Sequence, residues 1–461
     1  MRQLASILLA IFVFLAMNSL PTGTVQGQFS TNTPSGQTNE QPTNDTLRPG
    51  GFNFATNTPS GPTPTATNTA TSTATPTATA TNTSTPTATF TPTNTPSPTP
   101  TPNGPFSYPE GINPLTGLPY PDEAAMLRRN LIVKISNFPP IVRPQHGLNQ
   151  ADIVYEYEAE GGVTRFAAIY RSNNPERVGS IRSARLLDIE LTTMYSALLA
   201  YSGTSEPIQE LLLSEDFFNF QLISPSVGHA ENQNNDCDES PFCRNDTLRE
   251  AGTPREHTLF GNTNGMWAIA ERQGTNQGRI AFGFAFGENP DENGTAANDV
   301  FIEWWGQTDA RWQYNADEQI YQRFTDGQPH FDATDGEQVW ADNLVIIEVP
   351  HVDRPDLFPP DANYTSLGVE LWGQGRAYVI RDGQLYQGFW RRNENRAEGQ
   401  ALQLVYGDNR SIMLSPGRTW VTVVRGLGNA NINEAYTDVF ATATITALTP
   451  SPTPFDPNPD S

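Results

Sequence analysis

The chain has 461 residues and a formal net charge of −23, from 50 acidic and 27 basic side chains. This surplus of negative charge argues against binding to nucleic acid or to anionic lipid headgroups, since both would repel the protein. The length leaves room for two folded domains in addition to segments that do not fold.

The first 27 residues predict export, as a signal peptide or an N-terminal anchor. Arg2 precedes an apolar run over residues 7–17, which is shorter than the roughly 20 residues that span a bilayer as a helix. A short apolar run behind a positive charge is typical of a secretory signal peptide, with Val25-Gln26-Gly27 as the best candidate for cleavage. The alternative is an uncleaved anchor, which would be the only contact with a membrane. We therefore expect an extracytoplasmic protein, secreted or associated with the cell envelope.

A disordered linker is predicted over residues 28–104. It consists almost entirely of Thr, Pro, Ala, Asn, Ser and Gly, with repeats such as Thr73-Ala74-Thr75-Pro76. Such a low-complexity segment has too few apolar side chains to offset the entropy that is lost on ordering. A similar composition near the C-terminus predicts a disordered tail over residues 429–461. The linker is long enough to hold a folded part away from a membrane.

A mixed α/β domain is predicted over residues 105–277. Apolar runs and alternating apolar residues predict strands over residues 131–135, 152–158 and 163–170, and helical apolar spacing predicts helices over 188–199 and 206–213. Gly161-Gly162 interrupts the alternation between the second and third strands, which predicts that these two strands form a hairpin.

A β-rich domain is predicted over residues 278–428, so the overall fold class is α+β. Strand patterns cover residues 279–286, 300–305, 310–315, 320–324, 343–349 and 377–380, and the turn signals are Asp326-Gly327, Asp335-Gly336 and Asp382-Gly383. The aromatic residues of this half fit packed strand faces, and a surface that stacks on carbohydrate is the alternative. They are Trp304, Trp305, Trp312, Tyr314, Tyr321 and Phe324.

The two cysteines, Cys237 and Cys243, are separated by five residues. In an exported protein they predict a disulfide that closes this loop. A metal site would need further ligands at suitable spacing, and none is visible in the sequence. We therefore predict a structural disulfide, no metal and no cofactor.

Residues 151–185 form the most informative segment, because they combine five arginines with three glutamates in an acidic chain. These residues are Arg165, Arg171, Arg177, Arg182, Arg185, Glu156, Glu158 and Glu160. Guanidinium groups bind carboxylates and phosphates through two parallel hydrogen bonds. The cluster therefore suggests a site for an anion.

Longer motifs run through both predicted domains. They cover residues 113–118, 143–148, 151–156, 160–166 and 179–185 in the first half, and 321–324, 326–330, 341–343 and 415–420 in the second. Over residues 111–424 the chain resembles the YerB-like lipoproteins, a bacterial family of uncharacterised function that pairs an N-terminal with a C-terminal domain. The resemblance implies the same two domains and a place in the cell envelope, but no established reaction. The lipid-acceptor cysteine of those lipoproteins has no counterpart here.

The predicted ligand-binding residues are Arg143, Arg165, Arg182, Ser183 and Arg185. If three of these arginines share a pocket with Ser183, they would hold a carboxylate or phosphate, as found in peptide stems, teichoic acids and uronic acids. The alternative is an internal ion-pair lattice that fixes the sheet. The first hypothesis is therefore a protein that binds an anionic cell-wall ligand or an envelope protein.

The second hypothesis is a hydrolase or transferase that acts on a cell-wall polymer. Glu156 and Glu160 would serve as acid and base, as paired carboxylates do in glycoside cleavage. His257 would transfer protons, although a lone histidine is more often a structural hydrogen-bond donor. The sequence shows no metal-hydrolase spacing, nucleophile elbow, Walker loop or dinucleotide fingerprint. It therefore leaves open whether the protein is an enzyme, which would need its Glu and His side chains to converge in a cleft.

Overall fold

The computed structural model describes residues 103–433, except 215–220, 234–236, 238–239, 250–251, 305–307 and 358–364. The predicted signal peptide or anchor, the linker up to residue 102, the tail from residue 434 and Trp305 lie outside the described residues. All described residues belong to one unit, Asn94–Ser461. Within this part of the chain, no helix has the length and apolar character needed to cross a membrane.

The secondary structure confirms the predicted α+β class. The described α-helices all precede residue 273, and they are α2 (Glu123–Leu127), α3 (Leu186–Met194), α4 (Glu206–Ser214) and α6 (Thr263–Arg272). The strands of the first half are β1 (Leu131–Ser136), β2 (Ile153–Ala159), β3 (Val163–Tyr170), β4 (Val178–Gly179), β5 (Leu198–Ala200), β6 (Leu222–Ile223), β7 (Glu231–Asn232), β8 (Phe242–Arg244) and β9 (Leu259–Gly261). Those of the second half are β10 (Thr295–Ala296), β11 (Asp299–Glu303), β12 (Asp309–Asn315), β13 (Ile320–Thr325), β14 (Gln328–Pro329), β15 (Trp340–Ala341), β16 (Asn343–Glu348), β17 (His351–Arg354), β18 (Ser366–Val369), β19 (Gly373–Arg381), β20 (Gln384–Arg392), β21 (Gln403–Val405), β22 (Thr419–Val424) and β23 (Ala430–Ile432).

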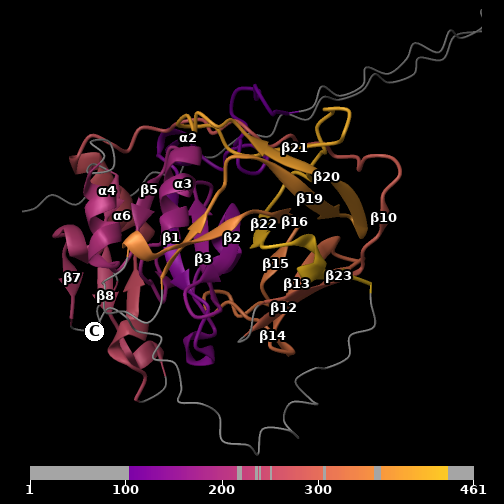
Figure 1. The fold of residues 1–461 in the computed structure, drawn as a ribbon. Helices are drawn as coiled ribbons and strands as arrows, with labels where there is room; N and C mark the ends of the chain where they lie inside the picture. The colour runs from indigo at the N-terminus through magenta and orange to yellow at the C-terminus, as the bar shows by residue number, and fades with distance from the viewer. Residues whose placement is uncertain are drawn as a thin grey trace, which may run out of the picture. The chain divides into compact units, whose positions relative to one another are not determined.

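Both halves of the chain contribute strands to one central sheet (Figure 1). Its order is β10-β20-β19-β16-β22-β2-β3-β1-β5-β6, with β21 paired to β20. The halves meet where β2 lies parallel to β22, in a register that places Tyr157 opposite Val423. At the other end of the sheet, β1, β5 and β6 are parallel to one another.

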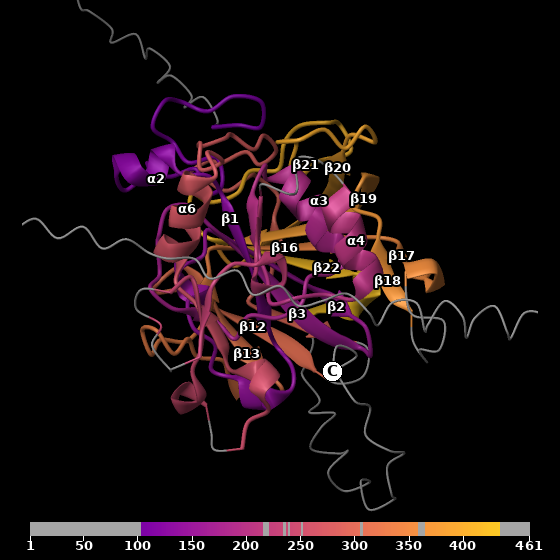
Figure 2. The same ribbon diagram turned by 90° about the vertical axis from the view of Figure 1, so that its left-hand side faces the viewer.

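The two faces of the central sheet are covered by different layers (Figure 2). On one face, α3 and α4 pack against Ile132 and Tyr155 of the sheet through Leu191 and Leu212. On the other face lies a second sheet, β14-β13-β12-β11-β23 with β15 beside β13. Its side chains share a core cluster with residues such as Val133, as do those of α6. Because strand residues alternate between faces, each buried strand serves both layers.

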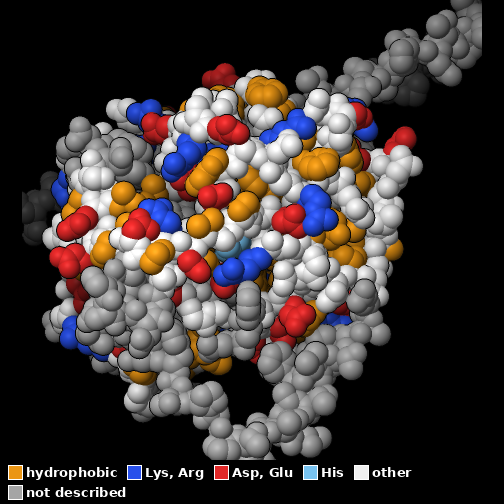
Figure 3. Space-filling view, viewed as in Figure 1, with side chains coloured by type: hydrophobic (Ala, Val, Ile, Leu, Met, Phe, Trp, Pro, Cys, Tyr) orange, Lys and Arg blue, Asp and Glu red, His pale blue; other side chains and the backbone are white. Residues whose placement is uncertain are grey.

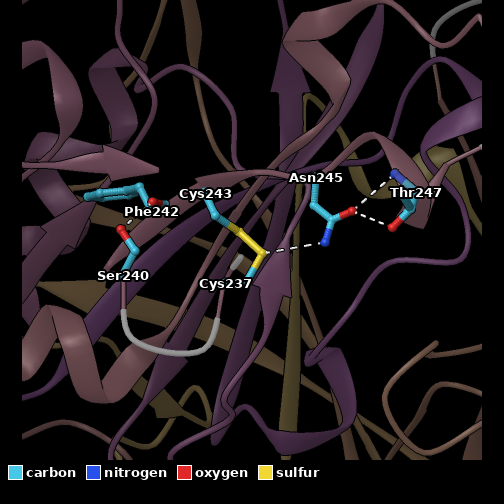
Figure 4. The surroundings of a disulfide bond; sticks show 6 residues. All are labelled: Cys237, Ser240, Phe242, Cys243, Asn245 and Thr247. Atoms are coloured by element: carbon cyan, nitrogen blue, oxygen red, sulfur yellow. Dashed lines mark hydrogen bonds between the residues drawn. A yellow bond between two sulfur atoms is a disulfide. The ribbon is translucent and has the colours of Figure 1, made fainter. Parts of the chain in front are cut away.

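A small sheet, β4-β9-β8-β7, carries the predicted disulfide. Cys237 is bonded to Cys243 of β8, with 5.2 Å between their Cα atoms (Figure 4). The Nδ2 atom of Asn245 lies 3.8 Å from the Cys237 sulfur (Figure 4). Both cysteines are buried, so the bond fixes the loop that leads into β8.

Most of the predicted elements are confirmed. β1, β2, β3 and α4 form where expected, and β2 and β3 pair as an antiparallel hairpin. Asp326-Gly327 and Asp382-Gly383 close the β13–β14 and β19–β20 hairpins, with positive φ at both residues of each turn. Of the aromatic residues, Trp304, Trp312 and Tyr321 are buried, as packed strand faces require.

Three predicted elements need correction. The helix predicted over residues 188–199 ends at Met194, because the apolar residues Leu198–Ala200 pair in parallel with β1 as β5. The strand predicted over 279–286 does not form, and this segment makes only isolated bridges, such as that of Phe286 to Leu414. β23 lies within the range predicted as tail, since it pairs with β11 and extends the folded part.

Candidate functional site

The predicted arginine motif lies where β1 and β5 end. The Ser136 amide donates to the Ser180 carbonyl at 2.9 Å, and the Arg182 amide donates to the Lys134 carbonyl at 3.1 Å. On the other side, the Ser202 amide, just after β5, donates to the Arg182 carbonyl at 3.1 Å. The segment 179–185 is therefore fixed between the carboxyl ends of two parallel strands.

Strand register places Arg165 beside this segment. Arg165 of β3 is opposite Ser136 of β1 and opposite Tyr157 of β2, so these side chains share one face of the sheet with Lys134. The Nη1 atom of Arg165 lies 3.4 Å from the Ser183 carbonyl oxygen. Arg165 is thus brought next to the backbone of Ser183.

Arg182 and Arg185 complete a group that we call the arginine cluster: Arg165, Arg182 and Arg185. Arg182 donates to the Glu256 carbonyl at 3.0 Å, and Arg185 pairs with the Glu160 carboxylate. All three side chains are largely buried. Together with Lys134, these three guanidinium groups outnumber the nearby carboxylates of Glu160 and Asp188, so positive charge is in excess in this region.

Glu160 is a carboxylate that contacts the arginine cluster. It follows β2 in the hairpin turn and lies against Arg185. Burial raises the pKa of Glu160, but the positive charges of Arg185 and Arg165 and the hydrogen bonds to the carboxylate together outweigh it and bring the pKa below its ordinary value. Glu160 therefore stays ionised and orients Arg185.

Glu156 lies on the opposite face of the sheet. It is fully buried and forms an ion pair with Arg323 of β13, with 2.8 Å between Oε2 and Nη1. The indole of Trp420 also donates to Oε2, at 3.2 Å. In the hairpin register Glu156 is opposite Phe166, whereas Arg165 is opposite Tyr157. The sheet thus separates the two carboxylates of the predicted acid–base pair.

His257 lies beside the arginine cluster but is a poor proton-transfer group. Burial, together with the positive charges of Arg182 and Arg165, lowers the pKa of His257 to about 3. The ring is therefore neutral near pH 7, far from the pKa that suits general acid–base catalysis at that pH. Its Nδ1 atom is buried without a hydrogen-bond partner among the residues that the structure describes.

Arg143 does not join the cluster. Its guanidinium pairs with Asp326 and donates to the Asn137 carbonyl at 3.2 Å and to Thr308 at 3.3 Å. These contacts hold Arg143 beside the second sheet, on the Glu156 side. The predicted set of ligand-binding residues is therefore divided between the two faces.

A buried triad that the sequence analysis missed lies on the same face as the arginine cluster. Lys134 Nζ is 3.2 Å from Asp188 Oδ1, and the Tyr157 hydroxyl contacts both groups. Asp188 Oδ2 also accepts from the Arg185 amide at 2.6 Å, at the start of α3. Burial lowers the pKa of Lys134 to about 8, although the negative charge of Asp188 acts to raise it. The sequence did contain a sign of this triad, because the only lysine of the chain lies within an apolar strand.

The arrangement suits binding of an anion. No group of three or more His, Cys, Asp or Glu side chains able to hold a metal occurs among the described residues. On the face drawn in Figure 3, acidic and basic side chains are interspersed, without a broad patch of one sign.

Two family models match the chain. One is described as Protein of unknown function (DUF3048) N-terminal domain and covers residues 115–276. The other is the DUF3048 C-terminal domain and covers residues 300–421. Both descriptions leave the function open, so these matches identify a family and its two regions.

A relative and a solved structure agree with this assignment. The chain is 26% identical over 326 residues to "Putative lipoprotein YerB" of Bacillus subtilis (strain 168), covering 70% of this chain and 88% of that protein. The crystal structure of the YerB protein from Bacillus subtilis matches with a TM-score of 0.56 at 24% identity, covering 70% of this chain and 99% of that one. The likeness to the solved structure shows a shared fold, and the two family models together match more than half of the chain. The protein therefore belongs to the YerB-like DUF3048 family.

Proposed function

We propose that this protein is a binding protein of the cell envelope that holds an anionic ligand at the arginine cluster. The observation that carries the proposal is the convergence of Arg165 from β3 with Arg182 and Arg185 from the segment before α3. Guanidinium groups recognise carboxylate and phosphate groups with directional, charge-assisted hydrogen bonds.

The position in the fold supports a ligand site. In open α/β sheets, ligands commonly bind in the crevice outside the carboxyl ends of parallel strands. The arginine cluster lies at the ends of β1 and β5, which are parallel, and next to the start of α3. Ligands are therefore expected at this edge of the sheet.

His257 supports a ligand with hydrogen-bonding groups in addition to its charge. The neutral ring has a buried Nδ1 atom without a partner among the described residues. A buried polar atom without a hydrogen bond is rare and costs free energy, which a ligand group would recover. The ligand would thus combine a carboxylate or phosphate with polar neighbours, as peptide stems, teichoic acids and uronic acids do. An acidic segment of an envelope protein would present the same carboxylates.

The hydrolase or transferase hypothesis gains no such support. Glu156 is enclosed by Arg323 and Trp420, and it lies on the far side of the sheet from Glu160. His257, with a pKa of about 3, is a weak base near pH 7. An anion-binding role needs none of these groups to transfer protons.

Ligand-induced thermal shift of the full chain tests the proposal. The probes are sn-glycerol 3-phosphate, glucuronate and D-alanyl-D-alanine, each titrated into the wild type and the Arg182→Ala and Arg185→Ala variants. A probe at 100 times its dissociation constant should add about 2.7 kcal/mol to the apparent free energy of unfolding. We expect a shift with the wild type that either substitution abolishes.

The matched control is Arg410→Ala, since Arg410 is an exposed arginine that pairs only with the nearby Asp408 among acidic groups of the described chain. Its variant should respond to the probes as the wild type does. If no probe stabilises the wild type and both cluster variants unfold far more easily, the arginines form a structural lattice and the proposal fails.

A further inference from the structure

A polar cavity lies between the two family regions, and none of the arginine cluster lines it. It has a volume of about 430 Å³. One wall comes from residues of the first region, including His146, Gln150 and Arg177, and the other from Ala333 and Thr334 of the second. Cavities of this size accommodate small ligands.

The backbone holds the walls of this cavity in place. The His146 amide donates to the Gly179 carbonyl at 2.8 Å, and the Gly179 amide donates back at 3.1 Å. Across the junction of the two regions, the Ala333 amide donates to the Gln145 carbonyl at 2.7 Å. The cavity is therefore built from fixed elements rather than from side chains alone.

Arg177 has an unusual environment for an arginine of this protein. Its guanidinium makes no hydrogen bond or ion pair with any residue that the structure describes, and its Nε atom is buried. In contrast, the buried Arg323 and Arg392 both pair with glutamates. A guanidinium that lines a cavity without a protein acceptor has its hydrogen-bonding capacity available to a ligand.

Two neutral side chains in the cavity share this property. His146 is only 7% exposed, and its ring nitrogens have no hydrogen bond within the described part of the chain. The Oε1 atom of Gln150 is buried and likewise lacks a donor among the described residues. Because buried polar atoms are nearly always hydrogen-bonded, the Nε atom of Arg177 and the Oε1 atom of Gln150 on one cavity point to a missing partner.

The lining of the cavity carries one charge of each sign, Arg177 and Glu176, so an anion would bind through the guanidinium and not through a net positive charge. Burial, followed by the positive charges of Arg177 and Arg249, lowers the pKa of His146 to about 4, so the ring is neutral near pH 7. Arg249 donates to the Pro144 carbonyl and the Ser180 hydroxyl, both uncharged acceptors. Glu176 also lines the cavity, but it is exposed and forms no ion pair with Arg177.

We propose that this cavity binds a small ligand in which an acidic group lies beside a hydrogen-bond donor. The acid would pair with the guanidinium of Arg177, and the donor would bind the Oε1 atom of Gln150. The neutral His146 ring would supply one further hydrogen bond. A peptide C-terminus offers this chemistry as a carboxylate next to an N–H group, and a glycerol or sugar phosphate offers it as a phosphate next to a hydroxyl.

Calorimetric titration of the full chain tests the proposal with three probes. N-acetylalanine represents the carboxylate source and sn-glycerol 3-phosphate the phosphate source, whereas N-acetylalaninamide lacks the charge. At least one acidic probe should bind, and the uncharged amide should not. Arg177→Ala should weaken that binding at least tenfold, while Arg177→Lys, which keeps the charge without the planar fork, should weaken it less.

Arg410→Ala is the matched arginine control and should leave the affinity unchanged. Which acidic probe binds identifies the source of the anion. An affinity that does not change in Arg177→Ala would overturn the proposal, even if the probe binds at the arginine cluster. Absence of binding by both acidic probes at millimolar concentration would overturn it as well. Arg177 has no protein partner to lose among the described residues, so its variants should keep the thermal stability of the wild type.

Discussion

The two faces of the central sheet treat buried charge in different ways. On the face toward the second sheet, Glu156 and Arg323 form a closed pair, and Arg323 lies within about 5 Å of the rings of Trp312 and Trp420. On the face toward α3, Lys134 and Arg185 also pair with carboxylates, those of Asp188 and Glu160. Arg165 and Arg182 add two further positive charges, so that positive groups are in excess at the end of the sheet. The same strands, β2 and β3, carry both arrangements.

The two faces therefore have different roles. The ion pair sealed between the two sheets joins Glu156 of one sheet to Arg323 of the other and fixes how the layers fit together. A group of positive charges where parallel strands end lies where loops and helix termini admit ligands. The first arrangement explains why the halves of the chain share a core, and the second carries the proposed function.

The largest loss of stability is expected when the buried pair of Glu156 and Arg323 is broken. Arg323→Ala would leave the Glu156 carboxylate buried without its counter-charge, and this should lower the free energy of unfolding by about 3–5 kcal/mol. Urea denaturation of the full chain measures the change. The double variant Glu156→Gln/Arg323→Met should recover part of the loss, because it removes both charges. A loss below about 1 kcal/mol in the single variant would show that the pair is not sealed.

A smaller loss of stability is expected for a substitution on the face toward α3. Lys134→Met should lower the free energy of unfolding by about 2 kcal/mol, less than a typical broken buried pair. The reason is that Asp188 keeps its hydrogen bonds from Tyr157 and the Arg185 amide. The same denaturation experiment measures the effect, and a loss as large as that of Arg323→Ala would remove the contrast between the faces.

The pH dependence of this variant sharpens the test. Because the pKa of Lys134 falls from 10.5 to about 8 on folding, the unfolded chain binds more protons than the folded one between these values. Stability therefore rises with pH across this window. The wild type should gain stability relative to Lys134→Met from pH 8 to pH 10.5 and show a constant difference below pH 7. A difference that shrinks as the pH rises from 8 would contradict the assigned shift.

The smallest change in the free energy of unfolding is expected for the ion pair of Glu158, which lies two residues after Glu156 in β2. Glu158 lies on the same face but pairs with Arg425, whose side chain is 38% exposed. Exposed ion pairs contribute roughly 0–1 kcal/mol, so Arg425→Ala should change the free energy of unfolding by less than about 1 kcal/mol. Denaturation at low and high salt checks this, since salt should reduce the effect further. A loss comparable to that of Arg323→Ala would mean that burial does not explain the difference.

Much of the local structure could be predicted from the sequence. Apolar runs, strand alternation and Asp-Gly turns identified β1, the β2–β3 hairpin and the β19–β20 turn. The parallel pairing of β2 with β22 could not be predicted, because it joins segments more than 260 residues apart by backbone hydrogen bonds that carry no sequence signature. For the same reason, a single sheet that runs through both halves was not foreseen.

The candidate site shows the same division. Arg165 comes close to Arg182 and Ser183 in the fold, and these residues also lie close along the chain. The separation of Glu156 from Glu160 could not be predicted in this way, because residues four apart in a strand share a face. Glu160 instead lies in the turn after β2, where it pairs with Arg185. The cavity of His146 and Arg177 depends on a loop from the second half of the chain. Only the tertiary structure could reveal it.

The most direct test of anion binding at the arginine cluster is anomalous diffraction from crystals soaked in selenate. The proposal predicts an anomalous peak within hydrogen-bonding distance of at least two of the guanidinium groups of Arg165, Arg182 and Arg185. Arg182→Ala crystals should lose that peak. If selenate leaves the cluster empty in the wild type, with the three arginines bound only to protein acceptors, the cluster is a structural lattice and the proposed function is wrong.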